Sequence, residues 1–105
     1  MNRGDVVWLP PDRQARGHEQ RGSRLGVVLQ SSALGGLSTV VVAVTSTSAR
    51  PSSFRPEIEV AGRRTRVMVE LLRAVDRARI GRRAGRLSWE ELAEVEGALR
   101  LVLGL

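Results

Sequence analysis

Cysteine and lysine are absent from this sequence of 105 residues, and it contains only three aromatic residues and one histidine. The absence of cysteine excludes disulfide bonds and thiolate metal sites. With so few aromatic residues, the core has to be built mainly from valine, leucine, isoleucine and alanine. No stretch approaches the roughly 20 apolar residues that span a membrane, and no long apolar run follows the first residues, as a signal peptide would require. These absences predict a cytoplasmic protein with no membrane segment.

The charge of the chain is strongly positive and unevenly distributed. The net charge is +6, and all 17 basic residues are arginine. Sixteen arginines and seven acids precede Ser88, whereas four of the 11 acids lie between Glu90 and Glu96. Arginine binds phosphate oxygens bidentately and stacks on bases, so this asymmetry favours a nucleic-acid partner. The alternative is a codon usage that encodes arginine wherever lysine would serve.

The hydrophobic pattern predicts one domain over residues 1–105. Apolar, β-branched runs indicate five short strands, at residues 6–9, 25–30, 39–45, 57–60 and 67–72. The third of these is apolar almost throughout and is expected to be buried on both faces. Turns are expected at residues 31–38 and 61–64, where glycines interrupt the pattern, and at most a short helical turn at 76–80.

The last part of the chain predicts an amphipathic helix. Ser88 and Glu91 have the spacing of a capping box, in which each side chain binds the backbone N–H of the other residue. Apolar residues then recur at helical spacing, at Leu92, Val95, Leu99 and Val102. Five strands and one late helix indicate a mainly β, or α+β, domain, for which a small, curved antiparallel barrel is the natural closure.

Two polar loops contain side chains of the types that take part in binding and catalysis. Residues 17–24 read GHEQRGSR and come directly before an apolar strand, and function often sits on loops that such a scaffold holds. The second loop, at residues 50–56, contains two prolines, two arginines and Phe54. Two roles are equally open for Phe54, stacking on a base or plugging a groove. Trp8 fits core or interface packing better than base stacking.

The residue types argue against metal-dependent, nucleotide-binding and serine-nucleophile enzymes, and they are compatible with metal-free RNA cleavage. One histidine, no cysteine and no paired acids outside the helix give no credible metal-ligand set, and no phosphate-binding glycine loop or Gly-x-Ser-x-Gly motif occurs. RNA can be cut without a protein nucleophile, because its 2′-hydroxyl attacks the neighbouring phosphate. Such cleavage needs charge stabilisation by arginine and a hydroxyl donor and general acid–base action by histidine or a carboxylate. Suitable side chains are His18, Glu19, Arg24, Thr45 and Glu70.

The same segments carry a family resemblance. The sequence resembles the MazF/PemK-type toxins of bacterial toxin–antitoxin systems in several segments, in order and at family-like spacing. These segments are RGDVVW at 3–8, GHEQRGSR at 17–24, VTS at 44–46, and the stretch from residue 70 through 76 to GRLS at 85–88. The resemblance implies an SH3-like barrel, shared with the CcdB type of gyrase poison. It also implies a sequence-specific, metal-independent endoribonuclease that needs no cofactor, leaves 2′,3′-cyclic phosphate and 5′-hydroxyl ends, and inhibits translation.

The resemblance assigns roles to individual residues. Arg24 and Thr45 fall on the active-site pair of these toxins. His18 falls on a histidine implicated in Kid/PemK members, and Glu70 on their fifth-strand acid. We expect the RNA to contact six further residues, namely Glu19, Gln20, Arg21, Ser46, Phe54 and Arg55.

The sequence departs from the family pattern at three positions. Leu25 stands where a proline usually follows the loop arginine. Met68 and Leu71 stand where Kid-like members carry an arginine and a glutamine around the fifth-strand acid. These last two departures leave the detailed acid–base assignment and base recognition open.

Structural explanations and other functions also remain open. A loop histidine is often simply solvated, Arg24 has Glu19 and Glu70 as possible ion-pair partners, and Thr45 can serve only to end a strand. The alternative functions are a non-catalytic nucleic-acid-binding barrel and a CcdB-like gyrase poison. As partners we expect an mRNA, tRNA or rRNA substrate, an acidic, MazE-like antitoxin and a second copy of the chain.

Overall fold

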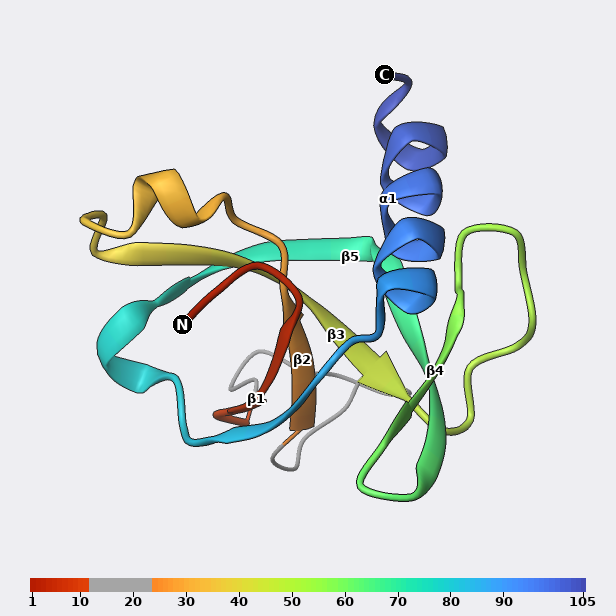
Figure 1. Ribbon diagram of the computed structural model, residues 1–105, viewed down its shortest axis with the longest axis horizontal. Coiled ribbons are helices and arrows are strands. Elements are labelled where there is room, and N and C mark those ends of the chain that lie inside the picture. The colour runs from red at the N-terminus through yellow and green to blue at the C-terminus, as the bar shows by residue number, and fades with distance from the viewer. Residues whose placement is uncertain (12–23) are drawn as a thin grey trace.

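The computed structural model describes residues 1–11 and 24–105. Six antiparallel strands form one sheet that curls into a nearly closed barrel, and a single α-helix ends the chain (Figure 1). The strands are β1 (Asp5–Leu9), β2 (Arg24–Val28), β3 (Thr39–Ser46), β4 (Glu57–Val60), β5 (Arg63–Asp76) and β6 (Arg83–Arg86). Their order in the sheet is β4-β5-β3-β2-β1-β6, so the predicted small antiparallel barrel with a late helix is confirmed.

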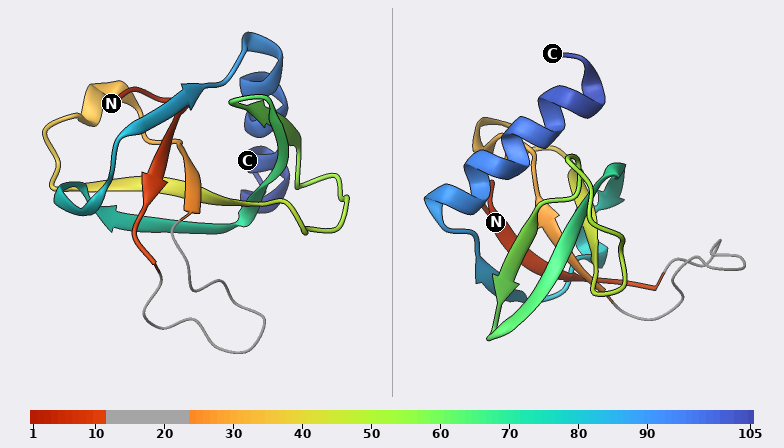
Figure 2. Two further views of the ribbon diagram at one scale, coloured as in Figure 1. Left: turned by 90° about the horizontal axis from the view of Figure 1, so that it is seen from below. Right: turned by 90° about the vertical axis from the view of Figure 1, so that its right-hand side faces the viewer.

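The two ends of the sheet approach each other. Gly85 on β6 faces Val60 on β4, and a Cβ added to Gly85 would lie 3.4 Å from a Val60 methyl group. The sheet therefore has little open edge between its first and last strands, which limits pairing with other chains. The α-helix α1 (Trp89–Leu103) lies along one side of this barrel and contacts β5 (Figure 2).

The apolar side chains form two clusters, one on each face of the curved sheet. The inner cluster fills the barrel and includes Val95 and Ala98 of α1. The outer cluster lies on the opposite face and is built from Val7, Leu9, Val28, Val40, Val42 and Val44. Successive strand residues point to opposite faces, and β3 contributes to both clusters, as predicted, although Val41 is exposed.

Strand β5 is longer than the sequence indicated, because the expected turn at 61–64 is tighter. Ala61 and Gly62 alone form the turn, both with positive φ, of 52° and 78°, as two-residue hairpins require. The strand then runs for 14 residues, and its register with β3 shifts between Ala43 and Thr45. It ends at Asp76, whose side chain accepts a hydrogen bond of 3.0 Å from the Ala78 N–H and caps the 3₁₀ turn η2 (Arg77–Arg79).

Strand β6 was not expected at all. Its sequence, RAGR, has no apolar alternation, and the strand forms because it pairs with β1. Next to this pairing, the buried Asp5 carboxylate lies 3.7 Å from Arg83 and 3.8 Å from Arg86. Tertiary pairing has therefore overridden a local sequence with little strand preference.

Helix α1 begins at the predicted capping box. The Glu91 N–H donates to Ser88 Oγ at 3.1 Å, and the Ser88 N–H donates to Glu91 Oε1 at 2.8 Å. An ion pair between Arg3 and Glu96 ties the helix to the N-terminus. The helix buries Val95 and Ala98, whereas Val102, predicted for the buried stripe, is 36% exposed beyond the end of the sheet.

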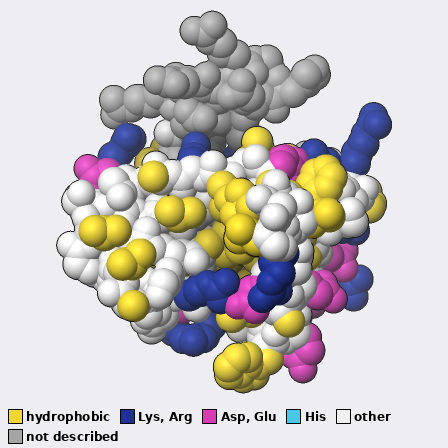
Figure 3. All heavy atoms as spheres, turned by 90° about the horizontal axis from the view of Figure 1, so that it is seen from above, with side chains coloured by type: hydrophobic (Ala, Val, Ile, Leu, Met, Phe, Trp, Pro, Cys, Tyr) yellow, Lys and Arg dark blue, Asp and Glu magenta, His cyan; other side chains and the backbone are white. Residues whose placement is uncertain are grey.

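Several large apolar side chains stay exposed near the end of α1 and around the 3₁₀ turn η1 (Ser32–Leu34). They are Leu34, Leu37, Leu101, Leu103 and Leu105. Seen from above, one face of the molecule shows apolar side chains gathered near its middle, with arginines around them (Figure 3). Among the described residues, no helix is long and apolar enough to cross a membrane.

Candidate functional site

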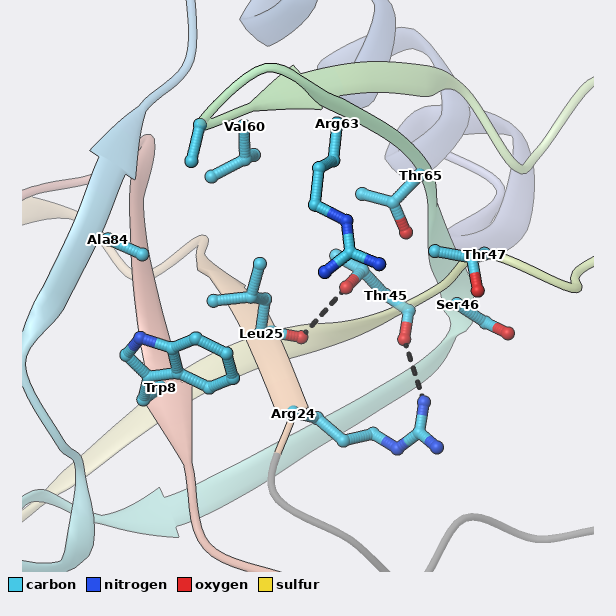
Figure 4. A pocket seen from close by; sticks show the side chains of 11 residues that line it. Trp8, Arg24, Leu25, Thr45, Ser46, Thr47, Val60, Arg63, Thr65 and Ala84 are labelled. Atoms are coloured by element: carbon cyan, nitrogen blue, oxygen red, sulfur yellow. Dashed lines mark hydrogen bonds between the residues drawn. The ribbon is translucent and has the colours of Figure 1, made fainter.

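A pocket of about 320 Å³ opens at the end of the barrel where strands β2, β3 and β5 meet (Figure 4). All six strands contribute to its lining. The polar side chains in the lining are Arg24, Thr45, Ser46, Thr47, Arg63 and Thr65. The structure thus brings three predicted site residues, Arg24, Thr45 and Ser46, into one pocket.

Arg24 is the first residue of β2 and lies at the rim of this pocket. It is paired with Leu9 of the outer cluster, and one guanidinium nitrogen, Nη1, donates to the Thr45 carbonyl oxygen at 3.2 Å. Its Nε is buried and has no hydrogen-bond partner among the described residues. Burial, and then the nearby charge of Arg73, lower the pKa of Arg24, although arginine stays protonated at physiological pH.

No carboxylate in residues 1–11 and 24–105 forms an ion pair with Arg24. The positive charge of Arg24 is therefore partly desolvated and lies near Arg73. No acid among the described residues neutralises it. An anion that entered the pocket would meet a cation whose position is already fixed, which is the arrangement that stabilises developing negative charge.

Thr45 is the second predicted active-site residue, and it is only 5% exposed. Its hydroxyl donates to the Leu25 carbonyl oxygen at 3.0 Å. This hydrogen bond fixes the side chain across β2 and β3, while the hydroxyl oxygen can still accept a hydrogen bond. Thr45 thus forms two hydrogen bonds across to β2, one with Arg24 and one with Leu25, as the dashed lines in Figure 4 show.

A second polar group, which we call the Arg55–Glu70 group, lies on β5 and the loop at residues 50–56. Nη2 of Arg55 lies 2.6 Å from Glu70 Oε2, and its Nε donates to the same oxygen at 2.8 Å. The other carboxylate oxygen, Oε1, is buried without a partner in the described structure. Arg66 donates to the Arg55 carbonyl oxygen at 2.9 Å and is paired across the sheet with Ser46 of the pocket.

The structure therefore separates the predicted site residues into two neighbouring groups. Glu70 is bound by Arg55, and Arg24 contacts the backbone of Thr45, so the alternative of an Arg24–Glu70 ion pair is not formed. Phe54 is partly buried against the inner cluster, and its ring lies 5.4 Å from the guanidinium carbon of Arg55, which favours the groove-plugging role. His18, Glu19, Gln20 and Arg21 lie outside the described residues.

Sequence reasoning missed two arginines near the site. Arg63 was placed in a turn, but it begins β5 and lines the pocket. Arg73 is paired with Val42 of the outer cluster, which puts it on the same sheet face as Arg24. Only the strand register reveals both positions. Met68, one of the departures from the family pattern, packs against the outer cluster. In the described residues, no three acidic or histidine side chains gather as a metal site would require.

Known proteins share both the sequence pattern and the fold of this chain. The family model for the PemK-like, MazF-like toxin of type II toxin–antitoxin systems matches residues 2–103. A Mycobacterium tuberculosis protein described as a candidate toxin is 43% identical over 104 residues, which cover 98% of this chain and 97% of that protein.

Solved structures agree in fold. The crystal structure of MazF from Deinococcus radiodurans has a TM-score of 0.82 and 28% identity, covering 100% of this chain and 97% of that chain. A mycobacterial endoribonuclease in complex with its cognate antitoxin has a TM-score of 0.84, covering 100% of this chain and 96% of that chain. At 17% identity, the second likeness shows the fold alone.

Proposed function

Because this chain belongs to the family of PemK-like, MazF-like toxins of type II toxin–antitoxin systems, we propose that it is a metal-independent endoribonuclease that cuts single-stranded RNA and so inhibits translation. One observation carries this proposal. Arg24 and Thr45 meet in a single pocket, and no acid among the described residues neutralises the arginine there. A site of this kind is suited to a phosphate that gains negative charge during a reaction.

The proposed reaction uses the 2′-hydroxyl of the RNA as its nucleophile. The 2′-oxygen forms a bond to the adjacent phosphorus, and the bond from phosphorus to the 5′-oxygen breaks, which leaves a 2′,3′-cyclic phosphate and a 5′-hydroxyl. Arg24 contributes by stabilising the extra charge on the phosphoryl oxygens, through the terminal N–H groups that the Thr45 carbonyl oxygen does not occupy. Thr45 holds Arg24 in position and offers its hydroxyl oxygen to the reacting groups.

Two protons have to move during this reaction, and we assign them to His18 and Glu70. One group removes the proton of the 2′-hydroxyl, and the other donates a proton to the leaving 5′-oxygen. Glu70 supports this assignment, because Arg55 fixes the position of its carboxylate and its side chain is still 25% exposed. His18 is six positions before Arg24 in the sequence. Ser46, Arg55 and residues 19–21 would contact the RNA around these groups.

The test is cleavage of a short single-stranded RNA by the purified protein in EDTA. We expect cleavage to continue, with one product carrying a 2′,3′-cyclic phosphate and the other a 5′-hydroxyl. A deoxyribose at the cut position should abolish cleavage and still allow binding. Loss of activity in EDTA that magnesium restores would contradict the metal-free mechanism. RNA binding without cleavage would instead support the non-catalytic binding barrel.

We also propose two protein partners, a second copy of the chain and an acidic antitoxin. The exposed leucines of α1 and the η1 region support dimerisation, since such side chains are commonly covered by a partner. The surplus of arginine before Ser88 supports an acidic partner, and a D. radiodurans MazF with a TM-score of 0.79 was crystallised with MazE. A monomeric mass by light scattering would contradict the first proposal. Antitoxin affinity that does not weaken as salt rises would contradict the second.

A further inference from the structure

We propose that the inner part of the pocket, between Trp8 and Arg63, is a guanine-binding subsite that selects the base beside the scissile phosphate. This inference rests on the proposed function, because it places the cut phosphate at Arg24. It adds a specificity-determining residue, Arg63, and the class of base that the residue recognises.

Strand register places Arg63 on the inward face of the barrel. Arg63 is paired with Val60, and two positions later Thr65 is paired with Ile58. Val60, Thr65 and Ile58 are all buried, at 5%, 7% and 2% exposed. Side chains two apart on a strand share a face, so the Arg63 side chain starts from the face that lines the barrel interior. Figure 4 shows its guanidinium group extending into the pocket.

The neighbouring arginine has the opposite orientation. Arg64 is paired with the exposed Glu59, and its guanidinium lies 3.7 Å from the Glu57 carboxylate on the outside of the hairpin. Arg63, by contrast, forms no ion pair with any acid among residues 1–11 and 24–105. Arg63 is an exposed residue, so its guanidinium group is accessible both to solvent and to a ligand that enters the pocket. Its N–H groups can therefore donate hydrogen bonds to a ligand in the pocket.

The rest of the pocket wall fits a flat, polar-edged ring. Trp8 supplies an aromatic side chain that is 36% exposed, and Leu25 is its partner across β1 and β2. Thr65 and Thr47 add hydroxyl groups. An exposed aromatic ring stacks on a base, and a volume of about 320 Å³ is at the small end for ligand pockets, which suits a single base.

Guanine is the base that these groups favour. The guanidinium fork of arginine forms two parallel hydrogen bonds to O6 and N7 of guanine, and this is the commonest specific contact between arginine and a base. Adenine presents a donor at the corresponding position, so it would leave part of the fork unpaired. Since Arg24 and Thr45 line the same pocket, a guanine held by Arg63 would bring its own nucleotide's phosphate to the reacting groups.

The experiment compares cleavage of a randomised single-stranded RNA pool by the full-length protein and three variants. Product ends are sequenced to give the base preference at each position around the cut. We expect the parental protein to prefer guanine at one position beside the cut. Arg63→Ala and Arg63→Lys should reduce that preference about tenfold to a hundredfold, because lysine keeps the charge and loses the planar fork. Arg64→Ala is the matched control, with the same change in charge, and should keep the parental preference.

Binding of nucleoside 3′-monophosphates separates this proposal from the cleavage mechanism. By NMR titration, 3′-GMP should bind more tightly than 3′-AMP, 3′-CMP and 3′-UMP, and Arg63→Ala should remove the difference. Selective binding of 3′-GMP in a protein that cuts no RNA would refute the proposed function and support the subsite. If cleavage depends on Arg24 but its base preference is unchanged in Arg63→Ala, the proposed function is supported and the guanine subsite is refuted. This second result is expected if the inner part of the pocket binds a protein partner.

Discussion

Two arginines, Arg24 in the pocket and Arg55 beside Glu70, hold the same charge in different surroundings. Arg55 places two nitrogens on one Glu70 oxygen, at 2.6 and 2.8 Å. Arg24 contacts a backbone carbonyl oxygen, lies near Arg73 and has no acid partner among the described residues. The charge of Arg55 is already compensated within the fold, whereas the charge of Arg24 is available to an incoming phosphate.

This difference in pairing assigns different roles to the two arginines: Arg24 is suited to bind the reacting phosphate, and Arg55 is suited to position Glu70. A paired arginine fixes the carboxylate that it binds, and the geometry of Glu70 therefore depends on Arg55. An unpaired, partly desolvated arginine is less favourable in the empty protein and gains most when an anion arrives. Proteins often give up some stability at functional sites in this way. Substitution of each arginine tests whether this protein gives up stability at the pocket.

The largest expected effect is on the rate of cleavage. Arg24→Ala should lower the rate by about a hundredfold to a thousandfold, the usual result of removing one preorganised donor to a developing charge. Arg24→Lys should recover only part of this loss, because lysine cannot reproduce the planar fork. Arg55→Ala should have a smaller effect, since its charge acts through Glu70. Single-turnover cleavage of one RNA measures all three variants, and parental activity in a folded Arg24→Ala would remove Arg24 from the site.

The next effect concerns the pH dependence of cleavage. Although burial and Arg73 lower the pKa of Arg24, an arginine remains charged across the range in which enzymes are assayed. Any limb of the pH–rate profile between about pH 4 and 9 must therefore come from other groups.

His18 and Glu70 are the groups that we expect to produce these limbs. Glu70→Gln should abolish the acidic limb if Glu70 is the general base, and His18→Ala should lower the rate about tenfold to a hundredfold. Profiles of kcat/KM for the parental protein and both variants decide the assignment. An acidic limb that persists in Glu70→Gln would show that Glu70 does not remove the proton, and leave it only a role in placing RNA.

The fold could be predicted largely because its signals are local. The Ser88–Glu91 capping box is complete within four residues, and it marks the start of α1 correctly. The apolar runs of β1 to β4 appear directly in the sequence. Strand β6 has no such signal, because its four residues form a strand only by pairing with β1.

The candidate site was less predictable, because it depends on which face of the sheet each side chain occupies. Arg24 and Thr45 were found from a family resemblance, and the structure places them together. Arg63 was missed because the turn before it uses two residues, where the sequence suggested four. Both positions are arginine, so the residue type does not show which one faces inward. A register shift of a single residue would exchange their faces.

The smallest expected effect is on the free energy of unfolding. It tests the contrast between Arg55 and Arg24 most directly, because only one of the two substitutions should lower stability. Arg55→Ala leaves the Glu70 carboxylate, whose side chain is 25% exposed, without its ion-pair partner. A pair that is neither fully exposed nor fully buried should contribute about 1–2 kcal/mol to the free energy of unfolding. Arg24→Gln removes a desolvated charge and its repulsion from Arg73, at the cost of one hydrogen bond to Thr45. We therefore expect Arg24→Gln to leave the free energy of unfolding unchanged or to raise it.

Urea unfolding at one fixed protein concentration measures both effects, because the stability of an associating protein depends on its concentration. The unfolding midpoint of Arg55→Ala should fall with an unchanged slope, and that of Arg24→Gln should not fall. A larger loss of stability in Arg24→Gln than in Arg55→Ala would mean that Arg24 holds β2 and β3 together through Thr45. In that case Arg24 would be a structural residue, and the distinction between a paired arginine for positioning and an unpaired one for chemistry would be wrong.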